Sequence, residues 1–141
     1  MSTVSAIMTR EVSVIQLSDT LQTAAQRMRD LDIGALPVCD GETLVGMVTD
    51  RDIAVRGVAT GLASDAALVS DVMTDDVQAC NPYDTVDAAM QQMGDAQVRR
   101  LPVLDAERRI VGIVALADLA TRQPAPTDTA LREISESATA A

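Results

Sequence analysis

The chain of 141 residues contains no histidine, no tryptophan and no phenylalanine, and its one aromatic side chain is Tyr83. Without histidine there is no Ser-His-Asp or Cys-His catalytic group and no histidine-ligated zinc. Without aromatic platforms there is nothing on which a single-stranded nucleic acid could stack its bases. No nucleophile–base pair and no metal-ligand spacing can be named among the residues that are present. We therefore expect that the protein is not an enzyme and has no metal site.

Basic residues are also scarce, since 11 Lys and Arg face 21 Asp and Glu and give a formal net charge of −10. A field of that sign repels the phosphates of nucleic acids and the surface of anionic membranes. No apolar run approaches the roughly 18 residues that a membrane helix needs. The start of the chain lacks a basic segment followed by an apolar one, which a secretory signal would show. We expect a cytoplasmic protein with no nucleic-acid or membrane partner.

The two cysteines, Cys39 and Cys80, lie in apolar stretches and form no Cys-x-x-Cys pair. Such residues behave as small apolar side chains, and the pattern favours buried free thiols in a reducing compartment. A disulfide between Cys39 and Cys80 is the alternative, and it needs the two residues to be close in space.

Four blocks of sequence occur twice in the same order, which indicates an internal repeat. Residues 4–9, 19–21 and 36–38 return 65 positions later as residues 69–74, 84–86 and 101–103. After one inserted residue, 44–48 returns as 110–114. We place the first repeat at residues 4–59, a linker at 60–68, the second repeat at 69–122 and a polar tail at 123–141.

Each repeat reads as strand, helix, strand, strand, helix. Apolar residues at helical spacing predict helices over 21–31 and 86–93, with Asp19 and Asp84 as their N-caps and Gln22 completing a capping box. Short first strands are predicted at 12–15 and 77–80. Strands 36–39 and 44–49 form a hairpin about Asp40 and Gly41, matched by 101–104 and 110–114. Closing helices are predicted at 50–58 and 116–122.

The segments 33–38 and 44–53, with their second copies, resemble the CBS domain family. The arrangement is similar to a stand-alone tandem pair, or Bateman module, such as the small bacterial CBS proteins of the hypoxic-response type. The resemblance implies an α/β (α+β) fold of two β-α-β-β-α repeats packed sheet to sheet about a pseudo-two-fold axis. It also implies clefts between the repeats that commonly hold adenosine nucleotides, and pairing of modules into homodimers.

One motif carries both a chemical and a family interpretation. Thr49 and Asp52 lie where a strand ends and a helix begins, where amide donors favour an anion and a carboxylate can accept two ribose hydroxyls. In the family the aspartate of this Thr-x-x-Asp motif binds the ribose, which the resemblance carries over to Asp52. The same spacing is also that of a capping box, which needs no ligand. The second copy has Ala115 in place of the threonine and keeps Asp118, so any second site there is weak.

Basic residues distinguish the two copies in the same region. Arg99 and Arg100 stand where the first repeat has Gly34 and Ala35. The resemblance implies that Arg99 and Arg100 contact the phosphates of the nucleotide held by Thr49 and Asp52, and charge-assisted bonds of that kind are strong. The alternative is that they are solvated surface charges. Arg51 is a third candidate contact.

With no aromatic side chain to stack on, adenine is expected to lie between aliphatic groups, with the backbone near Val12 and Ser13 reading its edge. The sequence thus predicts a regulatory module that binds AMP, ADP or ATP, requires no cofactor and acts in trans on an unknown protein target. S-adenosylmethionine is a weaker candidate, because its sulfonium gains nothing from Arg99 and Arg100. The alternative function is a structural or protein-interaction module with empty clefts.

Overall fold

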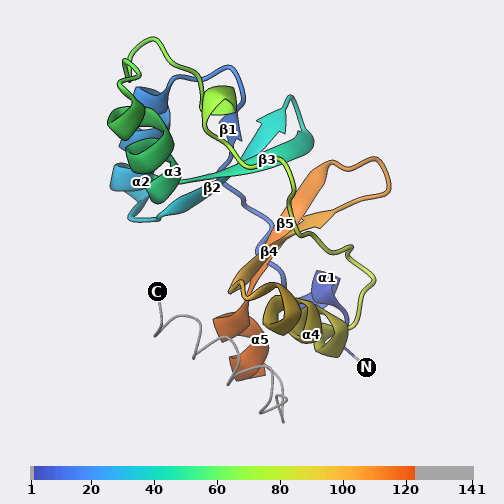
Figure 1. Ribbon diagram of the computed structural model, residues 1–141. Coiled ribbons are helices and arrows are strands. Elements are labelled where there is room, and N and C mark those ends of the chain that lie inside the picture. Colours follow the sequence, from blue (N-terminus) through green and yellow to red (C-terminus); the bar gives the residue numbers. More distant parts are fainter. Residues whose placement is uncertain (1, 123–141) are drawn as a thin grey trace. The chain divides into compact units, whose positions relative to one another are not determined.

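Residues 13–77 fold on themselves, and the segments on either side of them fold together. The computed structural model of the protein describes residues 2–122 (Figure 1). We call residues 13–77 the central unit, and residues 2–12 with 78–122 the terminal unit. The predicted tail at 123–141 lies outside the described residues.

The central unit contains a three-stranded sheet of order β1-β2-β3 (Figure 1). Strand β1 (Ile15–Gln16) runs parallel to β2 (Ala35–Asp40), and β2 runs antiparallel to β3 (Thr43–Thr49). The tight turn between β2 and β3 needs a left-handed residue, which Gly41 supplies at φ 66°. This confirms the predicted hairpin. The predicted first strand at 12–15 was placed too early, since β1 contains only its last residue.

Helices cover this sheet. Helix α2 (Leu21–Leu31) confirms the predicted first helix. The predicted helix at 50–58 is helical but not uniformly α: α3 (Asp50–Asp52) continues into the π-helix η1 (Ile53–Gly57) and the 3-10 turn η2 (Val58–Thr60). A further 3-10 turn, η3 (Val69–Asp71), closes the unit. The wider π turn brings Gly57 against Leu21, where a Cβ would lie 2.9 Å from a methyl carbon.

The terminal unit repeats much of this plan (Figure 1). It contains α1 (Val4–Ile7), α4 (Val86–Ala96), β4 (Arg100–Leu104), β5 (Ile110–Ala115) and α5 (Leu116–Arg122), and β4 and β5 form an antiparallel hairpin as predicted. Cys80 makes a single parallel bridge to Val103, in the place where β1 pairs with β2 in the central unit. The predicted strand at 77–80 is reduced to that bridge.

The N-caps of both long helices differ from the prediction. Thr20 caps α2 by accepting a hydrogen bond from the Thr23 amide, and Thr85 caps α4 in the same way. Asp19 instead accepts from the amide of Gln16, and Asp84 makes the equivalent bond to Asn81. Each aspartate therefore closes the turn before its helix, which is a common role for a side chain that competes with backbone acceptors. The predicted capping box with Gln22 is wrong.

Each unit has its own apolar core. The central core includes Ile15, Leu21, Leu36 and Val48, and the terminal core includes Met90, Met93, Leu101, Val114 and Leu119. All of these side chains are almost fully buried. Methionines thus fill core space in the terminal unit, as their position on apolar faces predicts.

The opening segments of the two sequence repeats change places. Residues 4–9 begin the first repeat but pack in the terminal unit, where Thr9 pairs with Ile113. Residues 69–74 begin the second repeat but pack in the central unit, where Thr74 pairs with Met47. The sequence repeats and the compact units are therefore offset, while the domain boundaries at 59, 68 and 122 stay predictions.

A glycine makes room for each of these segments. A Cβ on Gly46 would lie 2.7 Å from the Thr74 carbonyl oxygen and 2.9 Å from the Met73 sulfur. A Cβ on Gly112 would lie 2.6 Å from the Met8 sulfur and 3.0 Å from the Thr9 carbonyl oxygen. Both positions need a residue without a side chain, because real Cβ atoms do not approach so closely.

Both cysteines are free and buried in the part of the chain that the structure describes. Burial raises the pKa of the Cys39 thiol. Burial, together with the negative charge of Asp84, raises the pKa of Cys80 to about 11. The prediction of buried free thiols is confirmed, and Cys39 and Cys80 do not form a disulfide with each other.

We predict that Gly46→Ala lowers the free energy of unfolding by about 1–3 kcal/mol, because the backbone oxygen of Thr74 cannot move aside without breaking its pairing with Met47. Gly112→Ala should cost less, since the nearest atom there is the sulfur of a flexible methionine. Urea denaturation followed by circular dichroism compares the two. If both variants were as stable as the parent, the close contacts of Gly46 with Thr74 and of Gly112 with Met8 would be wrong.

The buried thiols should resist alkylation in the native protein. At pH 7.5 neither Cys39 nor Cys80 should react with iodoacetamide within hours, whereas both should react at once in denaturant, because the thiolate is the nucleophile. Since the folded pKa of Cys80 is raised from 9.0 to about 11, its contribution to stability is present below pH 9 and is lost as the pH rises toward 11. Mass spectrometry of the labelled peptides checks the first statement, and denaturation at pH 8 and 10 checks the second.

Candidate functional site

The Thr49 and Asp52 side chains form a reciprocal capping box at the end of β3. The hydroxyl oxygen of Thr49 accepts a hydrogen bond from the Asp52 amide at 3.0 Å, and Asp52 Oδ2 accepts from the Thr49 amide at 3.0 Å. The Asp52 side chain is only 16% exposed. The capping interpretation of this motif is therefore confirmed, and whether the same residues bind a ligand stays a prediction.

One oxygen of Asp52 is not used by the cap. Asp52 Oδ1 lies 3.9 Å from Nε of Arg56, one helical turn further along. Arg56 also reaches the carbonyl oxygen of Val72 through Nη1 at 3.5 Å. Because the cap holds Oδ2, Oδ1 keeps a defined direction and can accept a hydroxyl from a ligand. Arg56 was not predicted from the sequence, although its i,i+4 spacing from Asp52 is the signal of such a pair.

The backbone turns tightly at the neighbouring residues Asp50 and Arg51. The amide of Asp50 donates to the carbonyl oxygen of Gly34 at 2.9 Å, and the Arg51 amide donates to Asp50 Oδ1 at 2.8 Å. The predicted contact Arg51 is exposed and lies in the same unit as Thr49 and Asp52. A Cβ on Gly34 would be 3.1 Å from Asp50 Oδ2, so a residue larger than glycine would crowd this corner.

Arg99 and Arg100 lie in the terminal unit at the start of β4. Both are exposed. The carbonyl oxygen of Arg99 accepts from the amide of Leu116 at 2.8 Å, and Arg100 pairs with Ala115 across the hairpin. Within this unit the two arginines therefore border the first turn of α5, which contains the half-buried Asp118.

The predicted nucleotide-binding residues thus come from both units. Thr49, Arg51, Asp52 and Ser13 belong to the central unit, and Val12, Arg99 and Arg100 belong to the terminal unit. The structure brings together Thr49 with Asp52, and Arg100 with the Ala115 strand end, each within its own unit. The joining of the two sets around one nucleotide stays a prediction.

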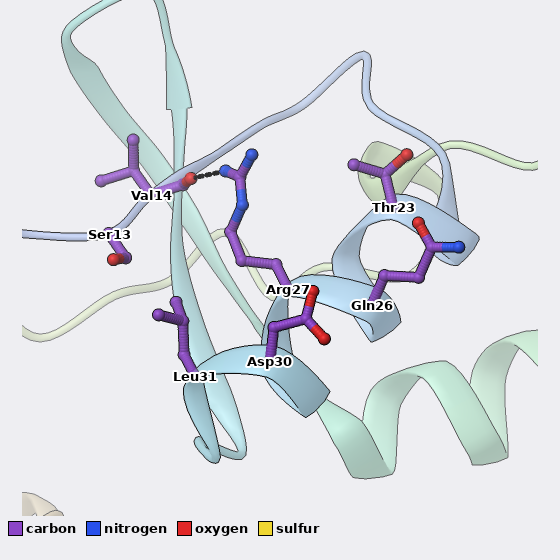
Figure 2. Close-up of a pocket in the computed structure, with 7 residues that line it drawn as sticks. All are labelled: Ser13, Val14, Thr23, Gln26, Arg27, Asp30 and Leu31. Carbon is purple, nitrogen blue, oxygen red and sulfur yellow. Dashed lines mark hydrogen bonds between the residues drawn. The ribbon is translucent and has the colours of Figure 1, made fainter.

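A groove in the central unit was not found from the sequence. It has a volume of about 440 Å³ and lies between α2 and the chain that enters β1. Figure 2 shows Ser13 and Val14 on one side and residues of α2 on the other. The guanidinium of Arg27 donates a hydrogen bond to the Val14 carbonyl oxygen across it. The available signal was a difference between the repeats, since Gln92 occupies the position of Arg27 in the second copy.

Residues 2–122 lack two features that would suggest other functions. These residues contain no group of three or more histidine, cysteine, aspartate and glutamate side chains arranged to hold a metal ion. No helix among them is both long and apolar enough to span a bilayer.

Comparison with known proteins identifies close relatives. The chain is 42% identical over 123 residues to the CBS domain-containing protein YhcV of Bacillus subtilis, covering 87% of this chain and 86% of that one. It is 41% identical over 125 residues to Hypoxic response protein 1 of Mycobacterium tuberculosis, covering 88% and 87%. Because these relatives are hardly longer than the matched region, they are stand-alone CBS proteins and not enzymes with an attached catalytic domain.

Solved structures share the fold. A crystal structure of Hypoxic Response Protein I with two coordinated zinc ions has a TM-score of 0.78 and 40% identity, covering 87% of this chain and 100% of that one. CBSX2 in complex with AMP has a TM-score of 0.72 and 25% identity, covering 84% and 93%. The CBS domain pair of MJ0100, in complex with 5′-methylthioadenosine and S-adenosyl-L-methionine, has a TM-score of 0.70 and 26% identity, covering 85% and 94%.

The CBS domain model matches residues 4–57 and again residues 69–124. These two matches coincide with the two copies of the internal repeat, and the mixed helix and strand structure agrees with the α+β class predicted from the sequence. The chain therefore belongs to the CBS domain family and contains two CBS domains in tandem.

Proposed function

We propose that this CBS pair is a regulatory module that senses AMP, ADP or ATP and acts in trans on another protein, as a cytoplasmic homodimer. The observation that carries the proposal is the capping box of Thr49 and Asp52, which fixes the carboxylate and leaves Asp52 Oδ1 free of the cap. A carboxylate oxygen held in this way is suited to accept a ribose hydroxyl. A related CBS protein, CBSX2, has been solved with AMP, which supports an adenine nucleotide as the ligand class.

Differences between the two copies support one principal site. The first copy has the complete Thr49–Asp52 box, whereas Ala115 in the second copy has no hydroxyl with which to form it. Conversely, the second copy has Arg99 and Arg100 where the first has Gly34 and Ala35. In the proposed complex the first copy supplies the sugar contacts and the second copy supplies the phosphate contacts, while Val12 and Ser13 border the base. Asp118 alone would give a weaker second site.

The charge of the two arginines favours a phosphate over a sulfonium. S-adenosylmethionine, found in the MJ0100 structure, carries a positive charge that gains nothing beside Arg99 and Arg100. A guanidinium pairs with phosphate through two parallel hydrogen bonds, which makes the phosphate contacts a large part of the affinity. We therefore rank nucleotides above S-adenosylmethionine.

A second candidate function, a protein-interaction module, is favoured by one surface. The segment after Asp52 exposes three aliphatic side chains: Val55 at 49%, Val58 at 65% and, just beyond the last helical turn, Leu62 at 39%. Single exposed aliphatic residues are common, but three on one short segment are a candidate contact area for another protein. This function requires no ligand and predicts that nucleotides leave the stability unchanged.

The first prediction for the proposed site is that AMP raises the melting temperature of the parent protein and that Asp52→Asn weakens AMP binding at least tenfold. Asparagine keeps an oxygen that can accept from the Thr49 amide, so the cap survives while the charge is lost. Ligand at about one hundred times its Kd should add about 2.7 kcal/mol of stability. Melts followed by circular dichroism, and calorimetric titration, provide the two readouts.

Asp71→Asn is the matched control for this test. Asp71 Oδ2 accepts from the Leu68 amide at 2.9 Å, so it closes a turn in the same unit without belonging to the proposed site. Asp71→Asn should bind AMP like the parent. An absence of any nucleotide effect up to millimolar concentration would instead favour the interaction module.

The second prediction concerns phosphate number. Arg100→Ala should reduce affinity for ATP at least tenfold and affinity for adenosine less than twofold, because the lost contact is made only to phosphate. Arg10→Ala is the control, since Arg10 is an exposed arginine of the same unit that hydrogen-bonds Ser5. Titration of each variant with adenosine, AMP and ATP gives the comparison. A uniform loss for all three ligands would place Arg100 outside the phosphate site.

A further inference from the structure

The groove between α2 and the chain entering β1 carries two opposite charges that the nucleotide proposal does not use. Arg27 and Asp30 both line it and lie three residues apart on α2, which places them on the same face of the helix (Figure 2). They do not form an ion pair with each other; Asp30 instead contacts Arg29 in a pair that is exposed on both sides. A pair so exposed contributes little and leaves the Asp30 carboxylate open to a competing cation.

Arg27 is held in position for binding. One of its terminal nitrogens donates to the Val14 carbonyl oxygen, which anchors the half-buried side chain against the opposite wall of the groove. A guanidinium has five N–H donors, so one hydrogen bond leaves most of the fork for a carboxylate. Ser13 and Thr23 line the same space. An arginine that is already ordered loses less entropy when a ligand binds.

The groove also has an apolar side. Val14 and Leu31 line it, and Leu31 is 46% exposed although it is a large aliphatic residue. The volume of about 440 Å³ is in the range of small-molecule sites. The lining thus offers one cation, one anion, hydroxyl groups and an aliphatic wall to a single compact ligand.

We propose that this groove binds a free α-amino acid with an aliphatic side chain. The carboxylate of the ligand pairs with Arg27, its ammonium pairs with Asp30, and its side chain lies against Leu31. The net charge of −10 supports a zwitterion over a simple anion, because an overall neutral ligand is not repelled by the field of the chain. This inference rests on Arg27, Asp30 and Leu31, none of which belongs to the proposed nucleotide site; the two sites share only Ser13.

The terminal unit contains a natural control. A groove of about 450 Å³ lies at the equivalent place, lined by Gln78, Ala88, Gln91, Gln92, Asp95 and Ala96. Gln92 occupies the position of Arg27 and donates to the carbonyl oxygen of Ala79 at 2.8 Å, just as Arg27 does to Val14. A similar volume and the anchoring hydrogen bond are therefore kept, and the acid is kept as Asp95, but the cation is missing, and Ala88 and Ala96 replace Thr23 and Leu31. This groove should not bind the amino acid.

The experiment uses the full chain labelled with ¹⁵N and titrated with leucine, with acetate and butylamine as ligands of one charge each. Leucine should shift the amide signals of Ser13, Val14 and Thr23 and saturate, whereas acetate and butylamine should bind at least tenfold more weakly. Arg27→Gln, which copies the second groove and keeps the anchor, should weaken leucine binding at least tenfold. Asp30→Asn should do the same.

The reciprocal variant Gln92→Arg tests a gain of binding. It should create a second set of leucine-dependent shifts at Gln78, Ala79 and Ala88. AMP binding should be the same in Arg27→Gln as in the parent, because Arg27 is outside the proposed nucleotide site, so the two proposals fail separately. Absence of saturable leucine shifts at 10 mM, equal shifts with acetate, or undiminished binding by Arg27→Gln would each overturn the proposal. A change of oligomeric state in Arg27→Gln without any leucine effect would also overturn it, by assigning the groove to a second copy of the chain.

Discussion

The structure depends on one backbone contact that each unit makes between a strand and a distant segment. In the central unit Met47 and Thr74 exchange two hydrogen bonds of 2.8 Å, and in the terminal unit Thr9 and Ile113 exchange two of 2.9 Å. Each contact is made beside a glycine whose missing side chain lets the segment approach. These contacts bring the buried Val4 and Val69 into the two cores. A repeat that begins at residue 4 therefore cannot complete its core from its own sequence alone.

Much of the fold followed from the sequence because its signals are local. Alternating apolar residues on either side of a turn predicted the two hairpins correctly. Apolar residues at helical spacing predicted α2 and α4, although α4 continues to Ala96, beyond the predicted end at residue 93. The N-caps were assigned to Asp19 and Asp84, whereas Thr20 and Thr85 fill that role. Both residue types are good caps, and only the backbone conformation decides between adjacent candidates. The exchange of segments is a choice between equivalent partners, which repeated sequences cannot distinguish.

The candidate sites divide in the same way. Thr49 and Asp52 were found because a motif within four residues defines both partners of the capping box. Arg27 was missed because its role depends on a carbonyl group that is remote in sequence, that of Val14. Arg56 also contacts a remote carbonyl, that of Val72, but its spacing from Asp52 was a local signal. The sequence around an arginine does not show whether its side chain is hydrogen-bonded to the protein or surrounded by solvent. A comparison of the two repeats could have indicated it, since Gln92 makes the hydrogen bond that corresponds to that of Arg27 but carries no charge.

Duplication explains how one chain can hold two sites of different chemistry. The buried positions of the two copies are constrained by packing, but the positions that differ most in charge, such as Gly34 and Arg99 or Arg27 and Gln92, lie outside the cores. Substitution there changes the local charge without changing the apolar core. The chain has no lysine, so its 11 basic residues are all arginines set among 21 acids. In the two proposals, guanidiniums create local positive sites in an acidic field; the nucleotide would meet long-range repulsion from that field, whereas the zwitterion would meet none. Added salt should therefore change AMP affinity more than leucine affinity, because screening acts chiefly on the net charge of the ligand.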